Sequence, residues 1–431
     1  MSIVKKYFFV FACILLSVKS LAQAPSPFST FGIGEPYGNA LVNTQGMGGT
    51  GVSQPQWWFL NNQNPALLVY NTLTVFEAGL VVEQRTIKDA SKKEKVTGGN
   101  MNYLLTAFPV LPARRPGETN RWTTSIGLMP STSVNYNLQY QEAISGSTEK
   151  VNITEQGSGG LSQLFWSNGV RLNDNFSVGV KASYIFSSVV NSYKNDLPAS
   201  ASPVGYIIAY EEQTYVRDFN FGWGGSFSKD SIGSKNLRFS VGAVANLGTD
   251  LNARRTIQFF RYDGSGTNPD SDTLADVKGK LHIPALLTAG VSLSRSLNWS
   301  LSTELSIQDW TKFQGFSSED EGLAQSWRWS LGGEYTPNPY ATENILKRIT
   351  YRLGVTYEQT PYSAPIANPQ KVKDLGATFG FSLPTGRSSI DMAFKFGKRG
   401  NKAENLIEES YFNIFLGITF NDQWFVKRKF D

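Results

Sequence analysis

Apolar and polar residues alternate with a period of two in many separate stretches of this chain. Between Phe176 and Phe186 every even-numbered residue is apolar or aromatic, and the odd-numbered positions are mostly small or polar. Side chains of a strand point alternately to its two faces, so the pattern predicts strands with one apolar and one polar face. The same pattern recurs at 299–310, 350–358, 374–383, 389–397 and 411–421.

The alternation fits both a soluble barrel and a membrane barrel, which turns its apolar faces to lipid around a polar interior. The polar faces carry charges in mid-strand, which a dry core would tolerate only if all were paired. These charges are Lys181, Arg238, Glu304, Arg328, Glu334, Arg352, Asp391 and Lys395. Tryptophans near strand ends fit interfacial girdles; they are Trp122, Trp166, Trp299, Trp327 and Trp424. We therefore predict a transmembrane barrel.

The first 22 residues have the features of a secretory signal peptide. Lys5 and Lys6 precede an apolar run from Tyr7 to Val18, and Ser20-Leu21-Ala22 is a small-x-small cleavage site. The run is too short for a membrane-spanning helix of about 20 residues. We expect the mature chain to begin at Gln23, and no cysteine follows that could carry a lipoprotein anchor.

Removal of the signal peptide changes the cysteine count and the charge. The only cysteine, Cys13, leaves with it, so the mature chain offers no disulfide, thiolate metal site or thiol nucleophile. Three lysines also leave, and the formal charge falls from +5 to 5 − 3 = +2. This balance gives no reason to expect a nucleic-acid partner. The 13% aromatic content and 40 glycines suit strands and turns.

The remaining 431 − 22 = 409 residues show no linker or composition shift, which favours one large β domain. The pattern predicts strands at 73–84, 99–108, 122–140, 160–172, 176–189, 213–228, 236–254, 280–295, 299–311, 326–336, 349–360, 373–384, 388–398 and 410–421. That is an all-β, antiparallel barrel of about fourteen strands, an even number as expected. Mostly short connections alternate with long polar ones at 85–98, 141–159, 190–212, 255–279 and 312–325.

Pro130 interrupts the third predicted strand. Proline cannot donate a ladder hydrogen bond, so it belongs at an edge, a bulge or a kink. One interpretation is a turn at Pro130-Ser131-Thr132 followed by a separate short strand. The other is a single long strand whose kink opens a lateral gap in the barrel wall. The even strand count requires the second.

Residues 23–72 do not alternate and are rich in glycine, proline, asparagine and aromatics. A barrel of this size has a lumen too wide for its wall side chains to fill. We therefore expect an N-terminal hatch at 23–72 inside a barrel formed by 73–431. The cluster Gly46-Met47-Gly48-Gly49-Thr50-Gly51 lacks the Lys-Ser/Thr and the strand–helix context of a phosphate loop.

This arrangement resembles the FadL-like outer-membrane transporters of hydrophobic compounds. The resemblance rests on residues 28–68, where the glycine cluster (Gly46, Gly48, Gly49) is followed by Asn64-Pro65-Ala66 before the first strand. It implies a fourteen-stranded barrel with a hatch, and a kinked third strand at Pro130. Segments 424–429 and 158–161 resemble divergent members in Bacteroidetes, which include partners of the type IX secretion translocon.

The expected function is passive uptake of a hydrophobic molecule, such as a long-chain fatty acid or an aromatic compound, without enzymatic activity or cofactor. The large apolar residues of the hatch either pack on the wall or line the ligand site; they are Phe28, Phe31, Trp57, Trp58 and Phe59. The alternative is a non-enzymatic barrel that serves a type IX-like secretion machine. We expect a monomer in the Gram-negative outer membrane, in contact with lipid and lipopolysaccharide.

Candidate chemical groups are few. The single histidine, His282, opens a predicted strand and is better explained as a polar wall residue than as a catalytic base. Acidic residues in predicted long loops have oxygen ligands suited to Ca²⁺, but solvated loop charges explain them more simply; these are Asp270, Asp272, Glu319, Asp320 and Glu321. We predict no metal site.

Overall fold

The structure is a computed structural model. It describes residues 24–89, 92–113, 119–144, 149–196, 207–233, 237–262, 270–295, 297–316, 322–363, 371–402 and 407–423. The predicted signal peptide, the acidic residues 319–321 and the C-terminal segment 424–429 lie outside these ranges.

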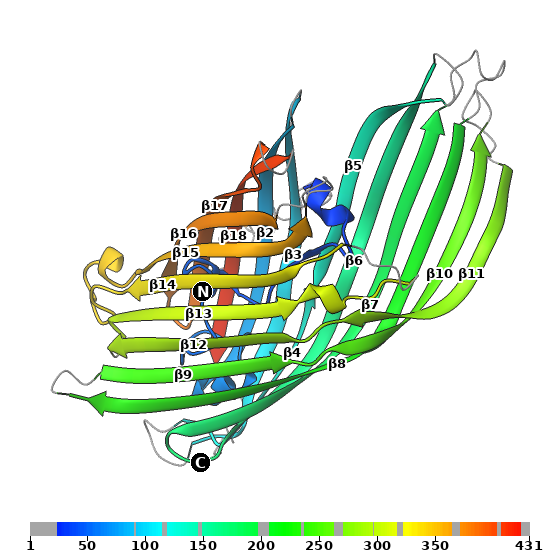
Figure 1. The fold of residues 1–431 in the computed structure, drawn as a ribbon. Helices are drawn as coiled ribbons and strands as arrows, with labels where there is room; N and C mark the ends of the chain where they lie inside the picture. The colour runs from blue at the N-terminus through cyan, green and yellow to red at the C-terminus, as the bar shows by residue number, and fades with distance from the viewer. Residues whose placement is uncertain are drawn as a thin grey trace, which may run out of the picture.

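Seventeen antiparallel strands form one closed wall (Figure 1), because the last strand pairs with the first wall strand from Asp422↔Thr74 to Glu408↔Lys88. They are β2 (Thr74–Lys88), β3 (Lys93–Leu111), β4 (Trp122–Pro130), β5 (Thr132–Ala143), β6 (Lys150–Arg171), β7 (Phe176–Asp196), β8 (Ile207–Ile232), β9 (Leu237–Asn246), β10 (Thr249–Tyr262), β11 (Asp270–Ile283), β12 (Leu286–Arg295), β13 (Trp299–Asp309), β14 (Gln325–Tyr335), β15 (Thr350–Ser363), β16 (Lys371–Thr385), β17 (Ser388–Arg399) and β18 (Glu408–Asp422).

Three wall strands are interrupted and are therefore counted twice. Both β4 and β5 pair with β6, and both β9 and β10 pair with β8. β11 and β12 pair with β10 and β9 in turn. The barrel thus has 17 − 3 = 14 strands, which confirms the predicted count and fold class.

The outer face of the wall is apolar and the inner face is polar. Trp166, Phe221 and Trp223 are more than 45% exposed, and so are many other apolar side chains of alternate positions. Lys181 and Arg352, from the polar positions, are buried. This is the arrangement of a barrel whose solvent outside is lipid. No helix in the described ranges is long and apolar enough to span a bilayer.

Several strands extend beyond their predicted ends. Residues 255–279 were expected to be a loop, but β10 and β11 occupy most of this range and pair from Thr249↔Ile283 to Arg261↔Asp270. The prediction was wrong there because apolar and polar residues do not alternate in these strand ends: Phe259 and Phe260 are adjacent on opposite faces, and Asp270-Ser271-Asp272 is polar throughout. Together with β5 to β8 they extend to one side of the barrel, away from β3 (Figure 1).

The third barrel strand breaks at Ser131, directly after Pro130. β4 lies between β3 and β6, whereas β5 pairs with β6 but not with β3. In the described part of the chain, β3 pairs with β4 only from Leu104 onward, so 93–103 has no strand partner on that side. We call this interruption between β3 and β5 the seam.

The N-terminal segment, residues 24–71, contains only short elements: η1 (Pro27–Thr30), β1 (Glu35–Pro36), α2 (Val42–Gln45) and η2 (Pro65–Tyr70). Both 3₁₀ turns have a proline near their start and a side-chain cap, from Ser26 or from Asn64. Leu41, Val42 and Leu60 pack with inner-facing wall residues such as Val75 and Phe165. Two further 3₁₀ turns, η3 (Trp310–Lys312) and η4 (Ile345–Lys347), follow wall strands.

Candidate functional site

A ring of wall glycines faces the N-terminal segment. A methyl group added at any of them would lie between 2.0 and 3.4 Å from that segment. The ring consists of Gly169, Gly179, Gly224, Gly242, Gly290, Gly332, Gly354, Gly380 and Gly417. The wall is therefore shaped to let a second backbone approach closely, as mid-strand glycine allows.

Asn64 joins this segment to the wall at one side of the glycine ring. Its side-chain oxygen accepts from the amide of Ala66 at 3.0 Å, and its nitrogen donates to the carbonyls of Val52 (2.8 Å) and Gly225 (3.0 Å). Pro65 lies against Gly179. The side chain of Asn64 therefore satisfies three backbone groups in a site with no access to water.

The glycine cluster at 46–51 is held at the other side of the ring. Gly48 and Gly49 have positive φ of 70° and 77°, which β-carbon-bearing residues rarely adopt. Arg328 donates to the carbonyl of Gly48 at 2.7 Å. Glu304 accepts from the amides of Gly51 and Val52, both at 3.0 Å. Two of the predicted mid-strand charges thus bind the backbone of the N-terminal segment.

The strap, residues 24–37, lies along the free edge of β5 at the seam. β1 pairs with β5 through Glu35↔Ser133 and Pro36↔Thr132. The amide of Tyr37 donates to the carbonyl of Ser131 at 2.9 Å. The strap therefore gives β5 the backbone partner that β3 does not supply.

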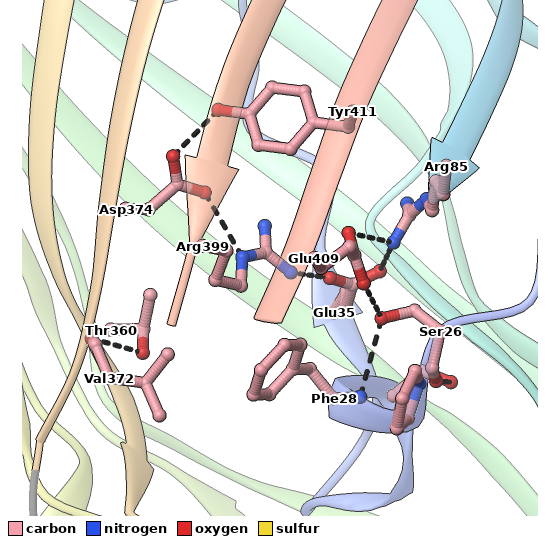
Figure 2. Close-up of polar contacts among 12 residues, drawn as sticks. Ser26, Phe28, Glu35, Arg85, Thr360, Val372, Asp374, Arg399, Glu409 and Tyr411 are labelled. Carbon is pink, nitrogen blue, oxygen red and sulfur yellow. Dashed lines mark hydrogen bonds and ion pairs between the residues drawn. The ribbon is translucent and has the colours of Figure 1, made fainter. Parts of the chain in front are cut away.

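A buried ion cluster joins the strap to the wall strands β2, β16, β17 and β18 (Figure 2). Glu35 of the strap binds Arg85 of β2 at 2.7 Å and also contacts Arg399 of β17. Arg85 binds Glu409 of β18 at 3.1 Å, and Ser26 donates to Glu409 at 2.7 Å. Asp374 binds Arg399 at 3.0 Å and accepts from Tyr411 at 2.6 Å.

The charge balance of this cluster fixes the ionisation of Glu35. Burial alone would raise its pKa, but the guanidinium groups of Arg85 and Arg399 outweigh that effect and lower the pKa from 4.5 to about 2. A lowered pKa means that the ionised carboxylate stabilises the folded strap at pH values above 4.5. This contribution is lost as the pH falls from 4.5 through 2.

A spin label at Pro36→Cys should report this loss. We expect the label to be immobile at neutral pH and to become mobile as the pH falls below 4.5, with reversal on neutralisation. A label at Thr385→Cys, at the end of β16, controls for unfolding of the barrel. A strap label that is already mobile at pH 6, or immobile at pH 2, would contradict the assignment.

The predicted aromatic residues separate into two groups. Phe28 and Phe31 pack on Tyr362, with ring centroids 5.7 and 5.5 Å apart. They belong to an apolar cluster of thirteen buried residues and their neighbours: Phe28, Ile33, Leu161, Ile185, Val216, Leu251, Ala253, Leu281, Trp310, Phe313, Leu323, Tyr362 and Val372, with Phe31, Ile283, Phe316 and Ile407 against it. Phe28 and Phe31 thus meet on one side chain, Tyr362, within this cluster.

Trp57, Trp58 and Phe59 lie outside this apolar cluster. Trp57 and Trp58 contact each other edge to face, and Trp57 is exposed. Phe59 lies below the guanidinium of Arg352, 5.1 Å from it. Of the five, Phe28 and Phe31 are the two that belong to this apolar cluster or pack against it, within the described chain.

His282 is partly exposed and contacts Asp250 at 2.6 Å across β10 and β11. Asp270 pairs with Arg261 at 2.9 Å. In the ranges that the structure describes, no group of three or more metal-ligating side chains is found.

Sequence reasoning did not find the glycine ring or the ion cluster. A signal for the ring exists: glycines recur in mid-strand, and the ladder pairs Gly169 with Gly179, Gly179 with Gly224, and Gly332 with Gly354. The ion cluster had no such signal, because Glu35 and Arg399 are 364 positions apart.

The closed wall, its apolar outer face and its polar inner face define an outer-membrane β-barrel of Gram-negative bacteria. The BamG family model matches residues 3–431 of the sequence. The chain therefore belongs to the BamG family. No curated protein matches the sequence.

Three solved structures of outer-membrane proteins have a fold similar to this one. The Pseudomonas putida toluene transporter TodX has a TM-score of 0.58 at 16% identity, over 90% of this chain and 99% of its own. A Pseudomonas aeruginosa FadL homologue gives 0.57 at 14%, over the same shares. The CymD monoaromatic hydrocarbon channel gives 0.54 at 16%, over 91% and 99%. At this identity the likeness establishes the fold.

Proposed function

We propose that this barrel is an outer-membrane channel for passive uptake of hydrophobic small molecules, such as long-chain fatty acids or aromatic compounds. The observation that carries the proposal is an apolar cluster inside the barrel that reaches the seam. Leu161 belongs to the cluster, and its carbonyl accepts from the amide of Ser131 at 2.8 Å. A barrel with a purely polar lumen would not need an apolar cluster inside it. A channel that binds a hydrophobic ligand does need apolar side chains to line the binding site.

The proposed route runs from the apolar cluster through the seam to lipid. Phe28 places one end of the strap in the cluster, and Glu35 and Pro36 place the other on the edge of β5. A ligand that displaced Phe28 would pull on the same short segment that covers the seam. In this proposal residues 42–68 act as a fixed hatch on the glycine ring, and only the strap moves.

A disulfide between the strap and β5 tests the route. The mature chain has no other cysteine, and Pro36 and Thr132 are ladder partners, so Pro36→Cys with Thr132→Cys meets the usual geometry. We expect the oxidised variant to take up labelled oleate and toluene no faster than a strain without the protein, and a reductant to restore uptake.

Thr288→Cys with Ser306→Cys, a ladder pair between β12 and β13, is the matched control. Unchanged uptake in the oxidised strap variant would reject the lateral route. Equal uptake in strains with and without the wild-type protein would reject transport itself.

A second candidate is a non-enzymatic partner of a type IX-like secretion machine. The observation that favours it is an open strand edge. One edge of β11 pairs with β10, and in the described residues the other edge has a single bridge, His282↔Gln314. Free edges are surfaces for strand addition by another protein. Chemical cross-linking in intact membranes, followed by purification, tests it, and recovery of the barrel alone would reject it.

A further inference from the structure

A cavity of about 620 Å³ lies among the extended strands, separate from the apolar cluster. Its lining comes from β5, β6, β7, β8 and β10, with Pro25 of the strap and Thr97 of β3 at one side. The volume is typical of a small-molecule site. None of its lining residues belongs to the apolar cluster described above.

The strand register arranges the lining in rows. Asn137 pairs with Gln156, Gln156 with Ser192, and Ser192 with Glu211, so one row crosses four strands. Ladder partners point to the same face and lie about 5 Å apart. The row therefore presents amide, hydroxyl and carboxylate groups in succession, which together both donate and accept hydrogen bonds.

A second row lies two residues further along the strands. Lys194 and Phe260 are both ladder partners of Ala209, whose buried methyl group forms the floor between them. Tyr262 also lines the cavity and stacks on Phe260 with centroids 6.2 Å apart. The aromatic pair supplies an apolar surface next to the polar row.

The cavity lies beyond the apolar belt of the wall. On β7 the exposed apolar positions end at Phe186, and Ser192 is six residues further on. At about 3.3 Å per residue, this is roughly 20 Å along the strand. A ligand there would come from water or from headgroups, not from the hydrocarbon layer.

We propose that this cavity binds a neutral oligosaccharide chain. A sugar ring has a rim of hydroxyl groups, which both donate and accept, and C–H faces that pack on aromatic rings. The polar row suits the rim, and Phe260 with Tyr262 suits the faces. Lys194 and Glu211 bring one charge of each sign, so the lining has no net preference for an anion. The assignment is independent of the uptake route.

Binding of defined sugars to the detergent-purified full barrel tests the proposal. The probes are a panel of neutral oligosaccharides and, separately, neutral O-polysaccharide fragments of lipopolysaccharide, measured by calorimetry. Binding of the first probes identifies free or capsular glycan as the source, and binding of the O-polysaccharide fragments alone identifies lipopolysaccharide.

Three variants locate the site. Ala209→Leu fills the floor and should abolish binding, and Tyr262→Ala should weaken it about tenfold. Thr214→Leu, on the opposite face of β8, should leave it unchanged. Heat-modifiable gel mobility confirms that each variant is folded. The proposal is overturned if no probe binds at millimolar concentration, or if Ala209→Leu binds as well as the wild type.

Discussion

Gly179→Ala is expected to loosen the N-terminal segment from the wall and to open the barrel to ions. The added methyl group would lie 2.4 Å from the carbonyl carbon of Pro65 and 2.5 Å from the amide nitrogen of Ala66. Both are backbone atoms that the Asn64 side chain holds in place, so neither can yield without loss of buried hydrogen bonds. Overpacking of this kind costs about 1–3 kcal/mol.

Conductance in planar bilayers measures the opening. We expect a low, steady conductance for the wild type and frequent large openings for Gly179→Ala, with a lower temperature for the heat-modifiable gel shift. Gly225→Ala is the matched control, because Gly225 pairs with the adjacent Val178 and a methyl group there meets nothing within 4 Å. If both variants conduct alike, the glycine ring does not position the N-terminal segment.

Arg85→Met is expected to release the strap at neutral pH. The guanidinium of Arg85 is buried and contacts three carboxylates, at 2.7 Å in Glu35, 3.1 Å in Glu409 and 3.5 Å in Glu83. Its removal leaves these acids close together with too few cations. The loss of one partner from a buried ion pair typically costs about 3–5 kcal/mol.

Denaturant unfolding in detergent and limited proteolysis of the strap measure the two consequences. Arg254→Met is the control, since Arg254 binds Asp276 at 2.5 Å on an exposed surface where such pairs contribute little. Adding Glu35→Gln to Arg85→Met should recover part of the lost stability, because it removes one of the unpaired charges. A strap that remains protease-resistant in Arg85→Met would show that the ladder with β5 alone holds it.

The predicted strands agree with the structure where lipid and water impose opposite demands on the two faces of the wall. There the pattern at 176–186 identified β7, and the even count followed once the residues around Pro130 were treated as one strand. The pattern carried no such information for 255–279, since both faces of those strands lie outside the apolar belt. Alternation shows that the two faces of a strand meet different solvents. It does not show whether the strand forms backbone hydrogen bonds with its neighbours.

The candidate site depended more on tertiary structure than the fold did. The composition of residues 23–72 indicated that this segment does not form wall strands, and Asn64-Pro65-Ala66 was recognised as a motif. Its hydrogen bonds run to Gly225, and the glycine cluster binds Glu304 and Arg328. The sequence shows which residue types are present, but it does not show which of them come into contact.

The period-two pattern by itself determined that this chain forms an amphipathic antiparallel barrel. Each residue of a wall strand is apolar or polar according to whether its side chain faces lipid or the lumen, so the pattern is local to each strand. Only the tertiary structure decided that the strap covers the seam and that the apolar cluster reaches Leu161. Those features depend on contacts between distant positions, such as Glu35 with Ser133 or Phe28 with Tyr362, and barrel closure brings them together. No local pattern encodes closure, because it is a property of the whole ring of strands.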